Sequence, residues 1–266
     1  MMDEPETSEP PADAEPLVTA ESLEPVGPPV PPERDPFWGY MDLLIFAGFA
    51  IPCMLAGLGV VKGSLWVLRL HAPVSTWELL AAQFAGYAFL FGALALLFRM
   101  QYDRPFWRSL GWVAPRMPFP TIVAYGVMLV FGLGMLGRLI HIPTGENPLT
   151  KLFKDPTSVI LIAIFGSIIA PVCEELVFRG FLQPVLVRSL GAVAGVLATA
   201  LPFGMLHYQE YGNSWRHVLL ISLSGVAFGW IRQATGSTKA AAGLHASFNG
   251  FQFVALIAAK GLGPYR

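Results

Sequence analysis

Charged residues are scarce in this chain of 266 residues. Asp, Glu, Lys and Arg make up 13% of it and apolar residues 54%, whereas about 25% of the residues of a soluble domain are charged. The mean hydropathy is +0.56. This composition excludes an ordinary soluble domain and is typical of a polytopic membrane protein, for which membrane lipid is an expected partner.

Cysteine and an excess of basic charge are also lacking. The two cysteines, Cys53 and Cys173, both lie in apolar stretches, which argues against a disulfide framework. The formal net charge is -1. Without a basic surplus, the chain has no electrostatic basis for binding nucleic acid.

Residues 1–36 differ from the rest of the chain in being acidic and rich in proline. They hold ten of the 23 prolines, and 11 of the 18 acidic residues fall within residues 1–42. Such a segment cannot bury enough apolar surface to offset the entropy lost on ordering, so we expect a disordered tail. It lacks the basic start and short apolar core of a signal peptide, so we expect the tail to be retained.

Apolar runs alternate with short polar connections over residues 37–266. A membrane span needs about 20 predominantly apolar residues. The pattern predicts an all-α fold, a polytopic transmembrane helix bundle of seven to eight spans. The seven runs are 41–61, 77–98, 119–138, 157–186, 191–208, 217–232 and 239–259.

The fourth run is too long for one simple span. Pro171 lies near its middle and is expected to kink or break the helix, because proline lacks the amide hydrogen of a regular helical turn. The sequence therefore leaves two alternatives open, an eighth helix or a helix that continues along the membrane surface.

Arginines in the connections indicate an orientation. The 99–118 connection carries four of them, more than any other, so the positive-inside rule places this connection and the N-terminus in the cytoplasm. The chain is then expected in the cell (inner) membrane.

Two adjacent glutamates interrupt the fourth run. An ionised side chain at the centre of a spanning helix costs roughly 2.5–3.5 kcal/mol and usually faces the bundle interior or water. Glu175 and Arg179 are four residues apart, so they share a helix face and can pair. Glu174 points about 100° away. This carboxylate is therefore left unpaired and suits general-base chemistry.

Two further apolar runs carry polar side chains one helical turn apart. Phe203 and His207 end the fifth run, and His245 and Asn249 lie on the seventh. The second pair can donate to an oxyanion or bind a metal. Taken singly, His207 and Asn249 are more often interhelical hydrogen-bonding residues, and Phe203 is a core residue. The joint occurrence of Glu, His, and His with Asn on three helices favours a site.

Other polar residues near these motifs are assigned no chemistry. Gln209 and Glu210 follow His207 at a helix end and are expected to be solvated. His217 lies beside a connection and is expected at the surface.

The three motifs together resemble a known pattern, E-E-x-x-x-R, F-x-x-x-H and H-x-x-x-N. It is the signature of the CPBP family, also called ABI, which contains the type II CAAX prenyl proteases and their bacterial relatives. The motifs are Glu174 to Arg179, Phe203 to His207, and His245 to Asn249, in the same order as in the family. The resemblance covers roughly residues 157–256, the motif-bearing core of the predicted membrane domain.

The resemblance implies an intramembrane endopeptidase of about eight helices around a water-accessible cavity. By this resemblance Glu174 and His207 activate the attacking water, and His245 and Asn249 stabilise the oxyanion. The structural or supporting residues are Glu175, Arg179 and Phe203. The substrate is then a peptide or a membrane protein.

The resemblance leaves the cofactor open. The family name includes metalloproteases, and Glu174, His207 and His245 are the candidate ligands for a divalent metal such as zinc. The spacing is not H-E-x-x-H, however, and the same residues can work without metal. Direct glutamate-dependent catalysis is the interpretation we favour.

Two other functions are compatible with the same predicted helix bundle. An ion-coupled transporter also places ionisable residues in the membrane. A non-catalytic scaffold or bacteriocin self-immunity protein keeps the fold without the chemistry. All the motif positions retain their catalytic residue types, which argues against an inactive relative.

Overall fold

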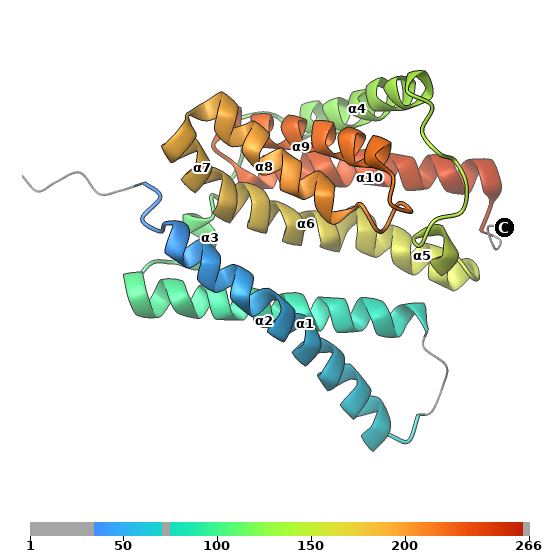
Figure 1. The fold of residues 1–266 in the computed structure, drawn as a ribbon, viewed down its shortest axis with the longest axis horizontal. Helices are drawn as coiled ribbons and strands as arrows, with labels where there is room; N and C mark the ends of the chain where they lie inside the picture. The colour runs from blue at the N-terminus through green and yellow to red at the C-terminus, as the bar shows by residue number, and fades with distance from the viewer. Residues whose placement is uncertain (1–34, 71–74, 263–266) are drawn as a thin grey trace, which may run out of the picture. The chain divides into compact units, whose positions relative to one another are not determined.

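A computed structural model of the protein describes residues 35–70 and 75–262. Nearly all of the predicted tail, residues 1–36, lies outside these ranges. Within them every regular element is helical, which confirms the all-α fold. Figure 1 labels the α-helices. In chain order the elements are α1 (Tyr40–Val67), α2 (Thr76–Tyr102), α3 (Phe106–Ser109), α4 (Phe119–Leu139), η2 (Thr150–Leu152), α5 (Pro156–Ile164), η3 (Phe165–Ile169), α6 (Ala170–Glu175), η4 (Leu176–Leu182), α7 (Gln183–Leu190), α8 (Ala192–Leu206), α9 (Trp215–Thr235) and α10 (Thr238–Lys260).

Each of the seven apolar runs forms a helix. Six helical segments are long and apolar enough to cross a membrane, namely α1, α2, α4, the continuous segment 156–190, α9 and α10. The remaining run, the fifth, forms α8, which is apolar but has only 15 residues. The chain is therefore a multi-pass membrane protein.

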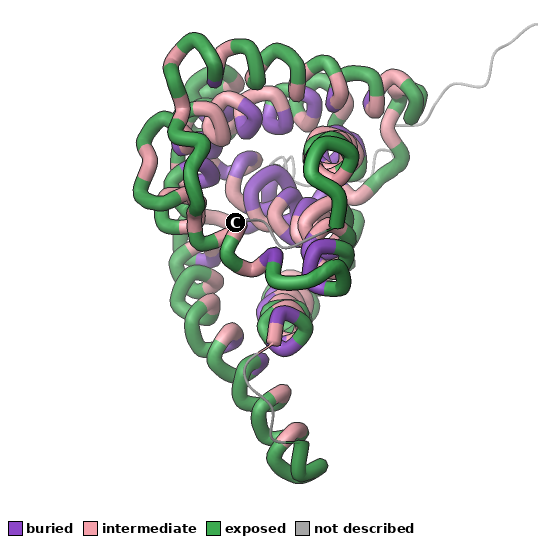
Figure 2. Tube along the Cα trace, turned by 90° about the vertical axis from the view of Figure 1, so that its right-hand side faces the viewer, coloured by how far each residue is buried: buried purple, intermediate pink, exposed green. Residues whose placement is uncertain are grey.

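Large apolar side chains cover much of the outer surface of this bundle. Leu44 and Trp66 on α1, Phe131 and Met135 on α4, and Leu206 at the end of α8 are all well exposed. The burial map in Figure 2 shows exposed residues along the outer helices and buried residues on the inner ones. Exposed apolar surface of this extent is expected where lipid replaces water.

The fourth run is one continuous helical segment of 35 residues, from Pro156 to Leu190. Pro171 does not end it. This proline is the second residue after the π-helical stretch η3, and a second π-helical stretch, η4, follows α6. Widened π turns relax the hydrogen-bond pattern that a proline interrupts, so the helix continues past it. At 1.5 Å per residue the segment is about 52 Å long, well over the roughly 30 Å of a bilayer core.

A buried apolar cluster holds the motif-bearing helices together. Phe178 of η4, Phe203 of α8, Phe228 of α9 and Leu244 of α10 belong to one core cluster, and each is less than 8% exposed. The rings of Phe178 and Phe203 meet edge to face at 5.2 Å. This cluster packs four elements far apart in the sequence around one point, which fixes the positions of the polar side chains beside it.

Close backbone contact between α1 and α2 depends on a glycine. A Cβ atom on Gly57 would lie 2.4 Å from the backbone nitrogen of Gly86, whereas one on Gly59 would meet nothing within 4 Å. We expect Gly57→Ala to lower the free energy of unfolding by about 1–3 kcal/mol, because the two helices must separate. Gly59→Ala on the same helix is the control and should be neutral or slightly stabilising. Unfolding of both variants in one detergent measures the difference, and equal stability would contradict it.

Candidate active site

The two adjacent glutamates of α6 lie in different environments. The side chain of Glu175 is completely buried, whereas that of Glu174 keeps 22% of its surface exposed and lines a cavity. Successive residues of a helix point about 100° apart, so one side chain can enter the core while the next faces open space. The sequence predicted this separation.

Glu175 is held by two partners. Its Oε1 atom accepts a hydrogen bond from Arg179 Nη1 at 2.9 Å, the predicted i, i+4 pair. The same oxygen accepts one from His245 Nδ1, also at 2.9 Å. The sequence predicted the first contact but not the second, because His245 is 70 residues away on α10.

Arg179 is fully buried among groups that compensate its charge. Besides Glu175, its Nη2 donates to the carbonyl oxygen of Gly225 on α9 at 2.7 Å. The guanidinium carbon lies 4.5 Å from the centre of the Phe203 ring, within cation–π range. Arg179 and Phe203 therefore form the support behind the site, and neither reaches the cavity with a charged group.

The contact with Glu175 sets the protonation pattern of His245. Because a carboxylate accepts, Nδ1 carries the hydrogen and Nε2 is left free to face the cavity. Nε2 lies 3.9 Å from Glu174 Oε2 and 3.2 Å from Asn249 Nδ2. The ring stacks on Phe228 with its centre 4.4 Å away, which holds its plane. Glu175 and Phe228 thus orient His245 toward Glu174.

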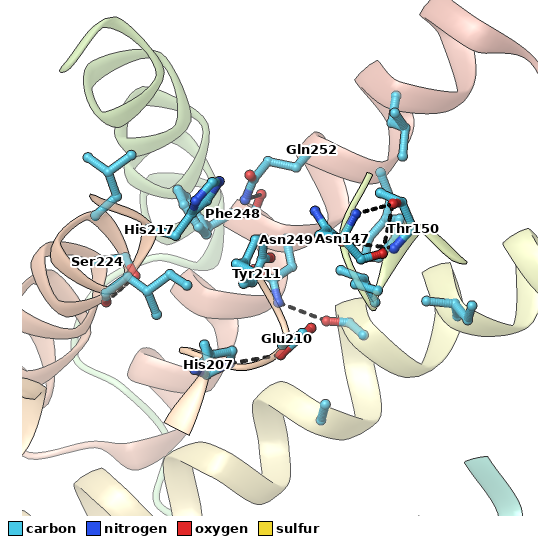
Figure 3. Close-up of a pocket in the computed structure, with 18 of the residues that line it drawn as sticks. Asn147, Thr150, His207, Glu210, Tyr211, His217, Ser224, Phe248, Asn249 and Gln252 are labelled. Atoms are coloured by element: carbon cyan, nitrogen blue, oxygen red, sulfur yellow. Dashed lines mark hydrogen bonds and ion pairs between the residues drawn. The ribbon is translucent and has the colours of Figure 1, made fainter. Parts of the chain in front are cut away.

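The amide of Asn249 is oriented by the π-helical stretch η3. Its Nδ2 donates to the carbonyl oxygen of Gly166 at 2.8 Å, shown as a dashed line in Figure 3. The other hydrogen of this amide points to His245 Nε2. Both donors of Asn249 are therefore engaged, one to the backbone and one to the neighbouring imidazole.

His207 stands at the end of α8 and reaches the cavity from another side. Its Nδ1 donates to the carbonyl oxygen of Phe203 at 2.9 Å, so Nε2 is the acceptor nitrogen in the neutral ring. Nε2 lies 3.9 Å from Glu210 Oε2. Figure 3 marks this contact with a dashed line. Within the described part of the chain, no hydrogen bond or ion pair joins His207 directly to Glu174.

A cavity of about 660 Å³ brings the four predicted catalytic residues together. Its wall includes Glu174, His207, His245 and Asn249, which come from α6, the end of α8, and α10. Most of the remaining wall is apolar. A site that combines a carboxylate, two imidazoles and an amide inside an apolar cavity can bind a peptide and exclude bulk solvent.

The same wall contains polar residues to which the sequence gave no role. Glu210, Tyr211 and His217 all line the cavity, and Tyr211 stacks on His217 with 4.9 Å between ring centres. Desolvation raises the pKa of Glu210 and that of Tyr211. Glu210 follows His207 by three residues, which is the only signal that could have indicated it. Placing it in the cavity required the path of the chain after α8.

The three candidate metal ligands do not form a ready metal site. A catalytic zinc takes three protein ligands at about 2.0–2.2 Å. Within residues 35–70 and 75–262, no group of three His, Cys, Asp or Glu side chains is placed to hold a metal ion. His245 Nε2 is engaged by Asn249, and His207 Nε2 faces Glu210. The donor set therefore does not fit a three-ligand zinc site.

Comparison with known proteins supports the resemblance of the three motifs. Residues 156–251 match the family described as type II CAAX prenyl endopeptidase Rce1-like. The matched segment runs from the start of α5 into α10 and contains Glu174, Glu175, Arg179, Phe203, His207, His245 and Asn249. Neither the search of curated proteins nor that of solved structures gave a match. The match of residues 156–251 to the Rce1-like family of CAAX prenyl endopeptidases agrees with the resemblance that the order and spacing of the motifs predicted.

Proposed function

We propose that the protein is an intramembrane endopeptidase that hydrolyses peptide bonds of membrane-associated substrates, with Glu174 as the general base. The observation that carries this proposal is the contrast between the two glutamates. Glu175 is occupied by Arg179 and His245, whereas Glu174 lines the cavity with its Oε2 3.9 Å from His245 Nε2. The family supports a protease.

In the proposed reaction, Glu174 takes a proton from a water molecule whose oxygen bonds to the carbonyl carbon of the substrate. The same proton returns to the amide nitrogen when the carbon–nitrogen bond breaks. His207 orients the water, because its Nδ1 hydrogen is committed to Phe203 and its Nε2 can accept. This assignment uses the carboxylate as base and then as acid, without a metal.

His245 and Asn249 are the proposed donors to the negative oxygen of the tetrahedral intermediate. In the structure, Asn249 directs one hydrogen to Gly166 and one to His245 Nε2. A substrate oxygen near this second hydrogen can replace His245 Nε2 as its acceptor, so the amide keeps its hydrogen bond to Gly166. His245 can donate once Nε2 is protonated, and Glu175 on Nδ1 stabilises the charged ring.

A reconstituted preparation tests the function. Purified protein in liposomes should cleave apolar peptides that span or enter the bilayer, and the new carboxyl group should carry ¹⁸O when the reaction runs in labelled water. Peptides that remain intact under these conditions, combined with proton or ion flux across the same liposomes, would replace the proposal with a transporter.

Asn249→Ala tests the oxyanion assignment. Removing one such donor typically lowers kcat by about 10²–10³-fold. We expect a loss of this size with little change in KM, because the interaction forms only in the transition state. Gln252→Ala, a change to another cavity-lining amide one turn further along α10, is the control and should leave kcat near the wild-type value. A rise in KM with unchanged kcat in Asn249→Ala would instead make Asn249 a substrate-binding residue.

A further inference from the structure

The charges in the cavity wall are unbalanced. Among the described residues that form the wall, the carboxylates are Glu174 and Glu210, and neither Lys nor Arg is present. The basic side chains of the wall are three histidines, His207, His217 and His245. An acidic group of the substrate would therefore meet two carboxylates and no permanent cation in a largely apolar cavity.

Arg179, a permanent cation behind the wall, is already paired with other groups. Arg179 is completely buried, and its guanidinium donates to Glu175 and to the carbonyl of Gly225. Phe203 covers it at 4.5 Å and itself forms part of the cavity wall. The charge of Arg179 is thus already compensated and is separated from the cavity by a ring.

Glu210 is the carboxylate for which the proposed reaction has no use. It lies in the segment between α8 and α9, and 38% of its side-chain surface is exposed. Its one ion-pair contact within the described residues is His207 Nε2, at 3.9 Å, too long for a direct hydrogen bond.

Figure 3 shows where Glu210 lies relative to the proposed chemistry. Its side chain stands beside that of His207, and Tyr211 and Asn249 line the same cavity. A substrate side chain that contacts Glu210 would therefore lie within a few residues of the bond under attack. An ammonium or guanidinium group at this point gains a charge-assisted hydrogen bond and neutralises the carboxylate.

We infer that Glu210 is a specificity-determining residue, and that its carboxylate binds a basic side chain of the substrate, Lys or Arg, next to the scissile bond. This inference rests on the proposed endopeptidase function and adds the class of substrate to it. The preferred substrate is an apolar peptide segment with one basic residue. An acidic residue at the same position is disfavoured.

Binding to a variant that cannot turn the substrate over tests the subsite directly. The probes are apolar, C-terminally amidated peptides that differ at one position, which holds Lys, norleucine or Glu and is moved along the peptide. Their Kd is measured on Glu174→Gln and on the double variant Glu174→Gln/Glu210→Gln. With Glu210 present, we expect Lys to bind about tenfold more tightly than norleucine at one position, the scale of one charge-assisted hydrogen bond. Without Glu210 the ratio should fall to about one.

Further variants separate charge from shape. Glu210→Lys should reverse the order, so that the Glu peptide binds more tightly than the Lys peptide. Glu210→Asp keeps the charge and should keep a preference for Lys. This variant provides the test if the other variants fold poorly. Gln209→Ala is the matched control, because Gln209 is exposed and is not part of the cavity wall. A Lys-to-norleucine ratio that is the same with and without Glu210, or near one at every position, overturns the inference.

Cleavage measured on the same peptides distinguishes the inference from the function on which it rests. If cleavage depends on Glu174 but the ratio of kcat/KM for the Lys and norleucine peptides is the same with and without Glu210, only the inference about Glu210 is overturned. If Lys peptides bind in a Glu210-dependent way but the wild type does not cleave them, the proposed endopeptidase function is overturned and the inference about Glu210 still holds. When both hold, the Lys preference in kcat/KM should match that in binding and disappear in Glu210→Gln.

Discussion

Glu174→Gln is expected to lower the rate of peptide cleavage by about 10²–10⁴-fold, the usual contribution of a general base. The amide of glutamine has the size and shape of the carboxylate but cannot take a proton from water. Because Glu174 is partly exposed to the cavity and makes no hydrogen bond to the core within the described residues, the change should not disturb folding. The protein should elute and unfold like the wild type while turnover is lost.

A second carboxylate-to-amide change shows whether the loss is specific. Glu146→Gln alters an exposed glutamate that is not part of the cavity wall, so its cleavage rate should equal that of the wild type. Cleavage by Glu174→Gln within a few-fold of the wild-type rate would remove Glu174 from the reaction. His207 would then be the remaining candidate for the base.

Glu175→Ala is expected to lower the free energy of unfolding by about 3–5 kcal/mol, the usual cost of removing one partner of a buried ion pair. The change leaves Arg179 without its carboxylate and the Nδ1 hydrogen of His245 without an acceptor, and both groups are buried. Unfolding in mixed micelles at increasing denaturing detergent measures the loss, and poor expression should accompany it.

Glu175→Gln separates the hydrogen bonds from the charge. Its side-chain oxygen can still accept from both partners, as Oε1 does in the wild type, so this variant should be more stable than Glu175→Ala. It should nevertheless lose activity, because a neutral amide stabilises a protonated His245 less well than a carboxylate does. Wild-type stability in Glu175→Ala would show that the contacts of Glu175 do not hold the helices together.

Much of the membrane architecture was predictable from composition and periodicity. Seven apolar runs became helices, because a lipid environment leaves a span no other way to satisfy its backbone hydrogen bonds. Two features needed the structure. Pro171 does not break its helix, since π turns lie on both sides of α6, and α8 is too short for an ordinary span. Neither the π turns nor the shortness of α8 follows from hydrophobicity alone.

The sequence by itself determined which residues are polar within the apolar runs and which share a helix face. That was enough to separate Glu174 from Glu175, to pair Glu175 with Arg179, and to place His245 beside Asn249. These are local relations, set by the 3.6-residue period of the helix. Only the tertiary structure decided that Glu175 orients His245 and that Glu210 enters the cavity wall, because both contacts depend on how separate helices pack and on where the chain turns between α8 and α9. Helix periodicity carries no information about such contacts.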